Sequence, residues 1–461
     1  MKTHMLRTLV VPAAAMALAG CNVKDALLEP QQPGVINPGD VQNAQGAGAQ
    51  SLRVGAIGRL QRLVGGGSGN QPNIWQIGGM LADEWKSSDS FTQSNQQDSR
   101  SVLSNDGLVA NEFTIIQQTR GSARDALVAL NEFAPARPWE AGEMYALIAF
   151  AELTLGENFC NGIPLGKTVG SEVTYTQPLT NAEVFASAVA HLDSALALAT
   201  STDTAAVRIR REALIMKARV LVDQGKFAEA AALVPVSTVP TNFQYVMTYA
   251  QTSQDNTMWG MSINLQRYSV SDSFDVAGII KNALPFASAK DPRVPVIGST
   301  IGSQFKGTDG TTSQVRQQLW PTRDAAIPVV SGIDARLIEA EARLNASDIP
   351  GTMTILNALR TSPQKLGDLN VVAMPVLPTP ATQDEAVSLF FREKAFWTFS
   401  RGQRLGDLRR LIRQYNRTQD QVFPTGTFFK GGIPYGTDVN LPVTDNERTN
   451  PNFKGCLDRK A

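Results

Sequence analysis

Apolar side chains recur at three- and four-residue spacing in residues 388–413 (SLFFREKAFWTFSRGQRLGDLRRLIR), near the end of the chain. Phe391, Ala395 and Phe399 lie at i, i+4 and i+8, which is the period of an α-helix. The aromatic residues cover an arc wider than the usual ~100° apolar stripe, so we expect this helix to be buried on more than one side. Such a helix requires earlier helices to pack against it.

The same period predicts pairs of helices in the preceding chain. The expected helices span 41–64, 109–133, 139–155, 181–199, 205–222, 227–234, 333–346 and 351–360. Thr180 with Glu183 forms the pattern of a capping box at the start of the fourth. The hairpin around the turn at Gly225 resembles a tetratricopeptide repeat, and residues 333–360 resemble a second copy. The pattern therefore predicts a mainly α fold in which tetratricopeptide-like helix pairs form a scaffold, over 41–235 and 331–413.

Between these two repeats, residues 236–330 lose the helical period and are rich in Ser, Thr, Asn, Gln and Pro. We expect a loop-rich insertion with short β-strands. Apolar and polar residues alternate from Trp259 to Tyr268, which predicts a half-buried strand. Its polar face carries Asn264 and Gln266, whose amides suit a neutral ligand rich in hydroxyl groups. An ordinary solvated strand face is the alternative, and the sequence leaves both open.

The start of the chain has the pattern of an export signal. Residues 1–20 combine Lys2 and Arg7 with a short apolar run, typical of a secretory signal, and the run is too short to span a bilayer. Leu18-Ala19-Gly20-Cys21 resembles a bacterial lipobox, in which the cysteine is lipidated and begins the mature chain. An ordinary signal with a chance cysteine is the alternative. We expect residues 21–40, with several Pro and Gly, to form a tether, and residues 41–461 to form one domain with the tail 414–461.

The charge balance and the cysteine positions limit which partners and which cross-links the chain can have. Basic and acidic residues balance at 42 each, and removal of the signal leaves a slight acidic excess, which argues against nucleic acid as a partner. The six arginines within 392–413 are interleaved with apolar aromatics, so we expect ion pairs and contacts with helix ends rather than a binding patch. Cys160 and Cys456 both lie in Gly/Asn-rich loops. Because an exported protein meets an oxidising compartment, we predict a Cys160–Cys456 disulfide, with two free thiols as the alternative.

Residues suited to catalysis are sparse. Beyond the signal the one histidine is His191, on an expected helix, and we interpret it as a packing or surface residue. The sequence has no Gly-x-Ser-x-Gly elbow and no Cys/His spacing typical of zinc, and residues 166–168 lack the first glycine of a phosphate loop. We predict no catalytic residue, no metal and no cofactor. The acid pairs 83–84 and 384–385 leave a surface glycosidase as an alternative, because sequence cannot give the separation of two carboxylates.

Several segments together resemble the SusD/RagB-like family. Arg392-Glu393-Lys394-Ala395-Phe396, followed by Gly402, Arg404 and Asp407-Leu408-Arg409-Arg410, is similar to that family's C-terminal motif. Residues 145–165 are similar to its helix ending in a Tyr-Gly-x-x-Pro-Leu turn, and residues 441–452 to its closing Ile-Pro … Asn-Pro-Asn segment. The chain departs from the family pattern at Ser400-Arg401, at Gly406 and at Asn158-Phe159.

The resemblance implies a lipoprotein anchored through Cys21 in the outer membrane and exposed at the cell surface. It further implies binding of an oligosaccharide or peptide, and a partner that is a TonB-dependent, SusC-like barrel transporter for which the protein serves as the lid. In this view the helices form the scaffold and the loops of 236–330 form the ligand side. A tetratricopeptide-type scaffold that binds only protein is the second alternative.

Residue chemistry suggests which side chains contact the ligand. We expect the ligand contacts to be Trp85, Asp89, Asn264, Tyr268 and Trp320. The aromatic rings would stack on sugar faces, while the carboxylate and the amide would form hydrogen bonds with hydroxyl groups. Trp75 and Trp259 lie in apolar contexts, so we expect both in the core.

Overall fold

The computed structural model describes residues 46–66, 71–169, 172–252 and 255–461. The predicted signal peptide, the lipidation site Cys21 and the tether 21–40 lie outside these ranges. Within them the chain is mainly α-helical, as the apolar period predicts, and its strands are short.

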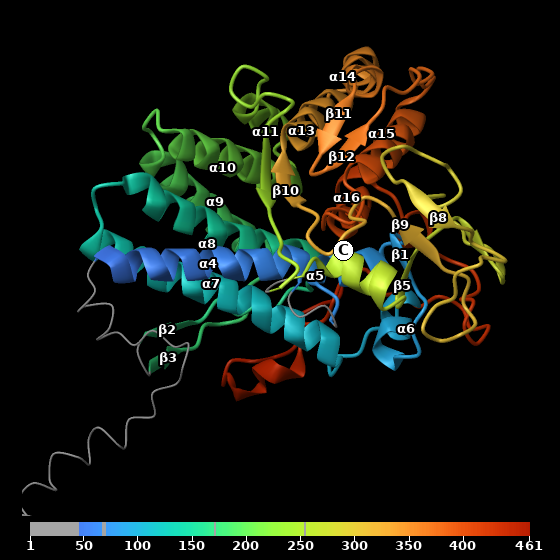
Figure 1. The fold of residues 1–461 in the computed structure, drawn as a ribbon, viewed down its shortest axis with the longest axis horizontal. Helices are drawn as coiled ribbons and strands as arrows, with labels where there is room; N and C mark the ends of the chain where they lie inside the picture. Colours follow the sequence, from blue (N-terminus) through green and yellow to red (C-terminus); the bar gives the residue numbers. More distant parts are fainter. Residues whose placement is uncertain (1–45, 67–70, 170–171, 253–254) are drawn as a thin grey trace, which may run out of the picture.

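Ten helices form what we call the helical frame (Figure 1). They are α4 (Gly46–Gly65), α7 (Gly107–Phe133), α8 (Pro138–Asn158), α9 (Asn181–Leu198), α10 (Thr204–Asp223), α11 (Phe227–Leu233), α13 (Gly332–Asn345), α14 (Ile349–Thr361), α15 (Gln383–Trp397) and α16 (Arg404–Tyr415). α4, α7 and α8 lie side by side, and α9 and α10 continue the stack. The shorter helices α5 (Ile74–Leu81), α6 (Thr92–Asp98) and α12 (Thr257–Trp259) lie outside the frame.

Local signals in the sequence fix several of these helix ends. Thr180 accepts a hydrogen bond from the backbone N–H of Glu183, and the Glu183 carboxylate accepts one from the N–H of Thr180, so the predicted capping box is present at α9. Gly225, with φ of 75°, makes the turn between α10 and α11. Thr382 and Glu385 form a second capping box at the start of α15. The predicted helical hairpins are therefore confirmed.

The described strands form six antiparallel pairs. They are β1 (Trp85–Ser87) with β5 (Tyr268–Val270), β2 (Lys167–Val169) with β3 (Glu172–Thr174), β4 (Gln244–Met247) with β10 (Ile327–Ser331), β6 (Phe274–Asp275) with β7 (Gly278–Ile279), β8 (Val296–Gly298) with β9 (Val315–Gln317), and β11 (Gln364–Leu366) with β12 (Leu369–Val371). Most of the strand residues between 236 and 330 belong to the loop-rich side of the molecule, at the right of Figure 1.

The strand predicted for Trp259–Tyr268 is wrong over most of its length. α12 and the π-helix Gly260–Asn264 occupy the segment, and strand β5 begins only at Tyr268. The Asn256 side chain accepts hydrogen bonds from the backbone N–H groups of Met258 and Trp259, which starts a helix that the alternating pattern does not reveal. Trp259, expected in the core, is only half-buried.

The aromatic residues of 388–413 are buried, as their wide apolar arc predicts. α15 and α16 pack on either side of a turn at Gly402, whose φ is 70°. A Cβ atom at Gly402 would lie 2.1 Å from Cδ1 of Trp75, so only glycine fits there. Trp75 is buried, as predicted.

The C-terminal tail returns to the end of α8. Cys160 and Cys456 form a disulfide that closes a sequence separation of 296 residues. The backbone N–H of Cys160 donates to the carbonyl of Leu441 at 2.9 Å, and Phe159 pairs with Leu441 in a parallel bridge. The tail is therefore held to the first half of the chain by both covalent and backbone contacts.

Candidate functional site

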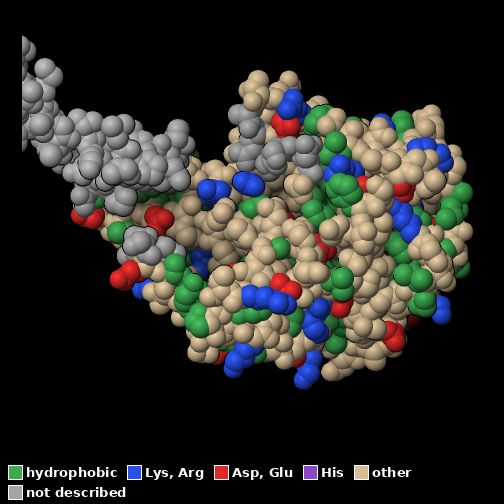
Figure 2. Space-filling model, turned by 90° about the horizontal axis from the view of Figure 1, so that it is seen from below, with side chains coloured by type: hydrophobic (Ala, Val, Ile, Leu, Met, Phe, Trp, Pro, Cys, Tyr) green, Lys and Arg blue, Asp and Glu red, His purple; other side chains and the backbone are tan. Residues whose placement is uncertain are grey.

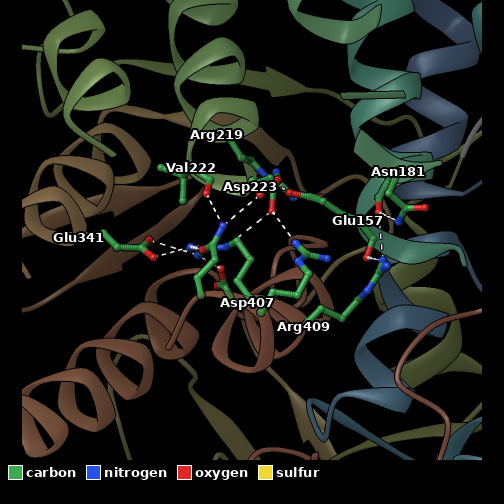
Figure 3. A network of polar contacts seen from close by, with 12 residues as sticks. Glu157, Asn181, Arg219, Val222, Asp223, Glu341, Asp407 and Arg409 are labelled. Atoms are coloured by element: carbon green, nitrogen blue, oxygen red, sulfur yellow. Dashed lines mark hydrogen bonds and ion pairs between the residues drawn. The ribbon is translucent and has the colours of Figure 1, made fainter. Parts of the chain in front are cut away.

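A buried network of ion pairs lies where α10, α13, α15 and α16 meet (Figure 3). Arg410 contacts Glu341 at 3.2 Å and Asp407 at 2.6 Å, and the ammonium of Lys394 lies 2.7 Å from Asp407. Burial alone would raise the pKa of Asp407, but Lys394 and Arg410 lower it. Lys394, Asp407 and Arg410 lie in the segment that resembles the SusD/RagB-like C-terminal motif, and their contacts with one another and with Glu341 join α13, α15 and α16.

Other arginines of the same stretch contact helix ends. Arg409 donates to the carbonyls of Gly156 and Glu157, at 3.0 and 2.7 Å, at the C-terminal end of α8. Arg401 pairs with Asp334 in α13, with Nη1 lying 3.0 Å from Oδ1. The prediction of ion pairs and helix-end contacts is confirmed for five of the six arginines within 392–413, while Arg392 is exposed and stacks on Phe396.

The void inside this network is too small for a ligand. Its volume is about 20 Å³, and its walls include Glu157, Asp223, Asp334 and Asp407. A volume of this size accommodates about one water molecule. Although four carboxylates converge on the void, a sugar ring cannot reach them, and we assign the cluster to holding the frame together.

Four of the five predicted ligand contacts are buried. The rings of Trp85 and Tyr268 are 0% exposed and Trp320 is 2% exposed, so none presents a face on which a sugar could stack. Asp89 is 1% exposed, with its carboxylate turned inward near Arg267. Asn264 alone is exposed. The aromatic stacking predicted for the three rings does not fit this structure.

Pairing of β1 with β5 nevertheless brings part of this predicted set together. The ring centroids of Trp85 and Tyr268 are 6.5 Å apart, and Ser87 lies opposite Tyr268. Trp85 donates from its indole N–H to the hydroxyl of Ser400 at 2.8 Å, and the N–H of Ser400 donates to Glu84 at 2.8 Å. Ser400 is one of the departures from the family pattern, and here it links β1 to the turn after α15.

The surface beside this buried core carries two stacked arginine–phenylalanine pairs. We call it the β5 face and define it by Phe91, Asn264, Gln266, Arg267, Phe305 and Arg316. The guanidinium of Arg267 lies 4.5 Å from the ring centroid of Phe91, and that of Arg316 lies 4.1 Å from the centroid of Phe305. Phe91 is 42% exposed. Stacking of this kind holds a guanidinium flat against the ring. The Nε group of Arg316 also donates to the side-chain oxygen of Gln314 at 3.0 Å, which further fixes its orientation.

Gln266 precedes Arg267 in the chain, and its side chain contacts Arg316 of the other pair. With its amide oriented to suit both neighbours, Gln266 donates to the carbonyl of Lys306 at 2.7 Å and accepts from Nη2 of Arg316 at 3.1 Å. Its backbone has a φ of 57°, a conformation that side chains rarely adopt. The carbonyl of Gln266 accepts from the hydroxyl of Ser88 and from the N–H of Thr308, at 2.8 and 3.1 Å. These contacts hold the strained turn in place.

An ion pair at the edge of the β5 face fixes its acidic group in the charged form. Lys430 lies 2.8 Å from the carboxylate of Asp309 and also donates to the carbonyl of Asp89 at 2.6 Å. Burial would raise the pKa of Asp309, but hydrogen bonds from Lys430 and Thr312 lower it to about 2. Sequence reasoning found Asn264 on this face but missed Phe91, Phe305 and the arginines. The sequence feature that comes closest to indicating these residues is the number of aromatic residues in the loops.

The β5 face can therefore offer guanidinium and amide donors, amide acceptors and partly exposed rings. Such a set suits hydroxyl-rich ligands, which need many hydrogen-bond partners and an apolar surface for the ring face. Within the described residues no group of three or more His, Cys, Asp or Glu has the arrangement of a metal site. None of the described helices is long and apolar enough to cross a bilayer.

Comparisons with known proteins bear on the fold. No family model matches the sequence, and a search of curated proteins finds no match either. Solved structures do match. Surface glycan-binding protein A from Bacteroides uniformis has a TM-score of 0.63 at 15% identity, covering 88% of this chain and 98% of that one. A SusD-like carbohydrate binding protein from Bacteroides vulgatus ATCC 8482 has a TM-score of 0.60 at 15% identity, covering 88% and 97%.

A SusD/RagB family protein from Bacteroides thetaiotaomicron gives a TM-score of 0.61 at 13% identity and covers 88% of this chain and 94% of that chain. Each likeness extends over most of both chains, although sequence identity is low. The fold expected from the C-terminal motif, the helix pairs and the loop insertion is thus the fold found. The described chain has the SusD-like fold.

Proposed function

We propose that this protein is a member of the SusD/RagB-like family that binds oligosaccharides at the β5 face. The observation that carries the proposal is the pair of guanidinium–phenyl stacks, one of which is hydrogen-bonded to the side chain of Gln266. Similar structures described as carbohydrate-binding or glycan-binding support the ligand class. We propose that the protein binds the sugar without cleaving it. The carboxylates clustered in the helical frame surround a void of about 20 Å³, which a sugar cannot enter.

The pattern of the first residues supports a location at the outer membrane. Cleavage before Cys21 and lipidation of that cysteine would anchor the chain at the outer membrane, with residues 21–40 as a tether and residues 41–461 as the folded domain. The partner we propose is a TonB-dependent barrel transporter, over which the protein closes as a lid and to which it delivers the ligand. A peptide ligand is the alternative to an oligosaccharide.

Calorimetric titration with a panel of neutral hexasaccharides (α-glucan, β-glucan, xylan and mannan) tests the binding function. We expect at least one member to bind, and the double variant Arg267→Ala/Arg316→Ala to weaken that binding by about tenfold or more, because two oriented charged donors are lost. Arg343→Ala, on the exposed end of α13, is the matched control. Chromatography of each titrated sugar should show no shortened product. Unchanged affinity in the double variant would remove the β5 face from the proposal.

Localisation and partnership need separate measurements. Metabolic labelling with a palmitate analogue should mark the wild-type chain and leave Cys21→Ser unlabelled. Pull-down of the lipidated protein from detergent-solubilised outer membranes should recover a barrel transporter in near-equal amount. Recovery of the protein from the soluble periplasm without a lipid, or without any barrel, would contradict the lid role while leaving sugar binding at the β5 face intact.

A further inference from the structure

A second concave surface lies away from the β5 face, between α7, the β2–β3 hairpin and the tail. We call it the α7 groove; its volume is about 430 Å³. Its floor is formed by α7 between Gln117 and Val128, one wall by residues 164–167 and 173–175, and the other by Glu447 and Asn450. This volume falls within the range of small-molecule sites, ~300–1,000 Å³. Figure 2 shows the molecule from below, where basic, acidic and apolar side chains are interspersed.

Two polar side chains of the groove are already engaged in building it. Arg120 donates to the carbonyls of Leu165 and Gly166, at 2.6 and 2.8 Å, and pairs with Glu152 at 3.1 Å. Gln117 donates to the carbonyl of Pro164 at 2.7 Å. These bonds attach the segment before β2 to α7, so the groove is held open by buried contacts and does not depend on a ligand for its shape.

Arg124, one helical turn after Arg120, is not engaged in this way. Its Nη1 is buried and has no hydrogen-bond partner among the described residues. The next residue, Asp125, also lines the groove and interacts electrostatically with Arg124, but no hydrogen bond to Asp125 occupies Nη1. A buried N–H group without a partner is unfavourable, because it has lost its hydrogen bonds to water and gained none in return. A ligand acceptor placed in the groove would remove that cost.

The neighbours of Arg124 indicate what kind of acceptor fits. Lys167 adds a second exposed cation to the lining. Tyr175 is 42% exposed and Val173 51% exposed, which gives an aromatic and an aliphatic surface beside the cations. Glu447 supplies a hydrogen-bonding group opposite α7, and partial burial raises the pKa of its carboxyl. Cations next to an exposed ring and a carboxyl group suit a ligand with an anionic group, an apolar ring face and hydroxyls.

We infer that the α7 groove is a binding site for a saccharide that bears a carboxylate, such as a uronic acid unit, with Arg124 as its principal anchor. A guanidinium binds a carboxylate through two parallel hydrogen bonds, which a neutral sugar cannot reproduce. Tyr175 packs against the sugar ring. This site is independent of the β5 face and of the function proposed for it.

Titration with tetragalacturonate tests the inference on the full chain. We expect binding that weakens as salt is raised, and that falls about tenfold or more in Arg124→Gln because the bidentate contact is lost. Arg343→Gln is the matched control, because it removes a guanidinium from an exposed pair on α13. Maltotetraose, which has no carboxylate, should not compete.

A second variant separates binding from folding. A Cβ atom at Gly121 would meet nothing within 4 Å, and Gly121 lines the groove. Gly121→Leu should therefore fill the groove, keep or raise helix stability, and abolish tetragalacturonate binding. Arg267→Ala/Arg316→Ala should leave that binding unchanged.

Three results would overturn the inference. The first is unaltered tetragalacturonate affinity in both Arg124→Gln and Gly121→Leu. The second is displacement of tetragalacturonate by an equal concentration of maltotetraose, which would show that the groove does not recognise the carboxylate. The third is stronger binding of a tetra-alanine peptide than of tetragalacturonate, which would assign the groove to a peptide carboxylate.

Discussion

The helical frame and the loop-rich segment 236–330 use arginine in opposite ways. In the frame, Arg410 is buried, and its guanidinium is enclosed by carboxylates of its own helix α16 and of α13. On the loop side, Arg316 lies at the surface, flat against a phenyl ring and hydrogen-bonded to an amide. A buried arginine with fixed acidic partners cannot change partners, whereas the stacked Arg316 remains partly exposed to solvent. The first arrangement serves folding and the second suits recognition.

Removing a buried arginine from the frame should have the largest effect. Arg410→Ala leaves Glu341 and Asp407 buried with fewer positive partners, so we expect the free energy of unfolding to fall by about 3–5 kcal/mol. Urea denaturation followed by circular dichroism measures this. Arg392→Ala, at an exposed position of α15, is the matched control and should change it by less than about 0.5 kcal/mol. If both substitutions lowered the free energy of unfolding by the same amount, the ion pairs of Arg410 would not be what stabilises the frame.

Loss of the disulfide should come next. Cys160→Ser/Cys456→Ser opens a closure across 296 residues, and we expect a loss of about 2–5 kcal/mol in the free energy of unfolding. The backbone bonds between residues 159–160 and Leu441 remain, so the tail should be cut sooner by protease while the frame stays intact. Mass spectrometry of timed digests checks this. A tail as resistant as in the wild type would show that the backbone contacts suffice.

Glu84 gives a pH-dependent test at the junction of frame and loops. Burial raises the pKa of Glu84 from 4.5 to about 8, against the lowering effect of the Ser400 N–H. The folded state holds this proton more tightly than the unfolded state. Its contribution to stability is therefore present below about pH 4.5 and is lost as pH rises toward 8. Glu84→Gln should flatten that decline and be more stable than wild type at pH 8 by on the order of 2 kcal/mol.

Thermal melts between about pH 5 and 8.5 measure this difference. Glu229→Gln, at an exposed position on α11, provides the control and should melt in parallel with wild type throughout. A Glu84→Gln curve that also runs parallel to wild type would mean that the folded and unfolded states bind the proton equally well.

The smallest effect is expected on the β5 face. Arg316→Ala should change the free energy of unfolding by less than about 1 kcal/mol, because a stacked surface cation contributes little to folding. The same urea titration used for Arg410→Ala provides the comparison. A loss from Arg316→Ala as large as that from Arg410→Ala would mean that Arg316 serves folding as well as recognition.

The sequence predicted the frame well because helix formation there follows local rules. Apolar period, the cap at Thr180 and the turn at Gly225 all act within a few residues, and each is present in the structure. The helix at 257–264 was missed because one N-cap residue, Asn256, outweighed the alternating pattern after it. Short loop segments carry too few positions for periodicity to decide between helix and strand.

The site was predicted less well, for a different reason. Large aromatic residues in polar segments predict ligand contacts. Whether such a ring is buried, however, depends on which distant segments of the chain pack onto it. Trp85 is covered because Ser400 and Phe399 pack onto it from more than 300 residues away. Phe91 is exposed and Phe305 is half-buried, and each ring lies beside an arginine. Neither outcome is visible in the composition of the surrounding residues.

The Cys160–Cys456 bond also decides how the protein would respond to a pulling force. If load entered through a tether at the N-terminus and left at the far end, it would pass from residue 160 directly to residue 456. The intervening 296 residues, which could otherwise extend by roughly 1,000 Å at ~3.4 Å per residue, would be shielded from it. The two repeat hairpins and every residue of the β5 face except Phe91 lie inside this covalent ring. Traction on the chain would then strain its flanks, while the part of the recognition surface inside the ring kept its shape.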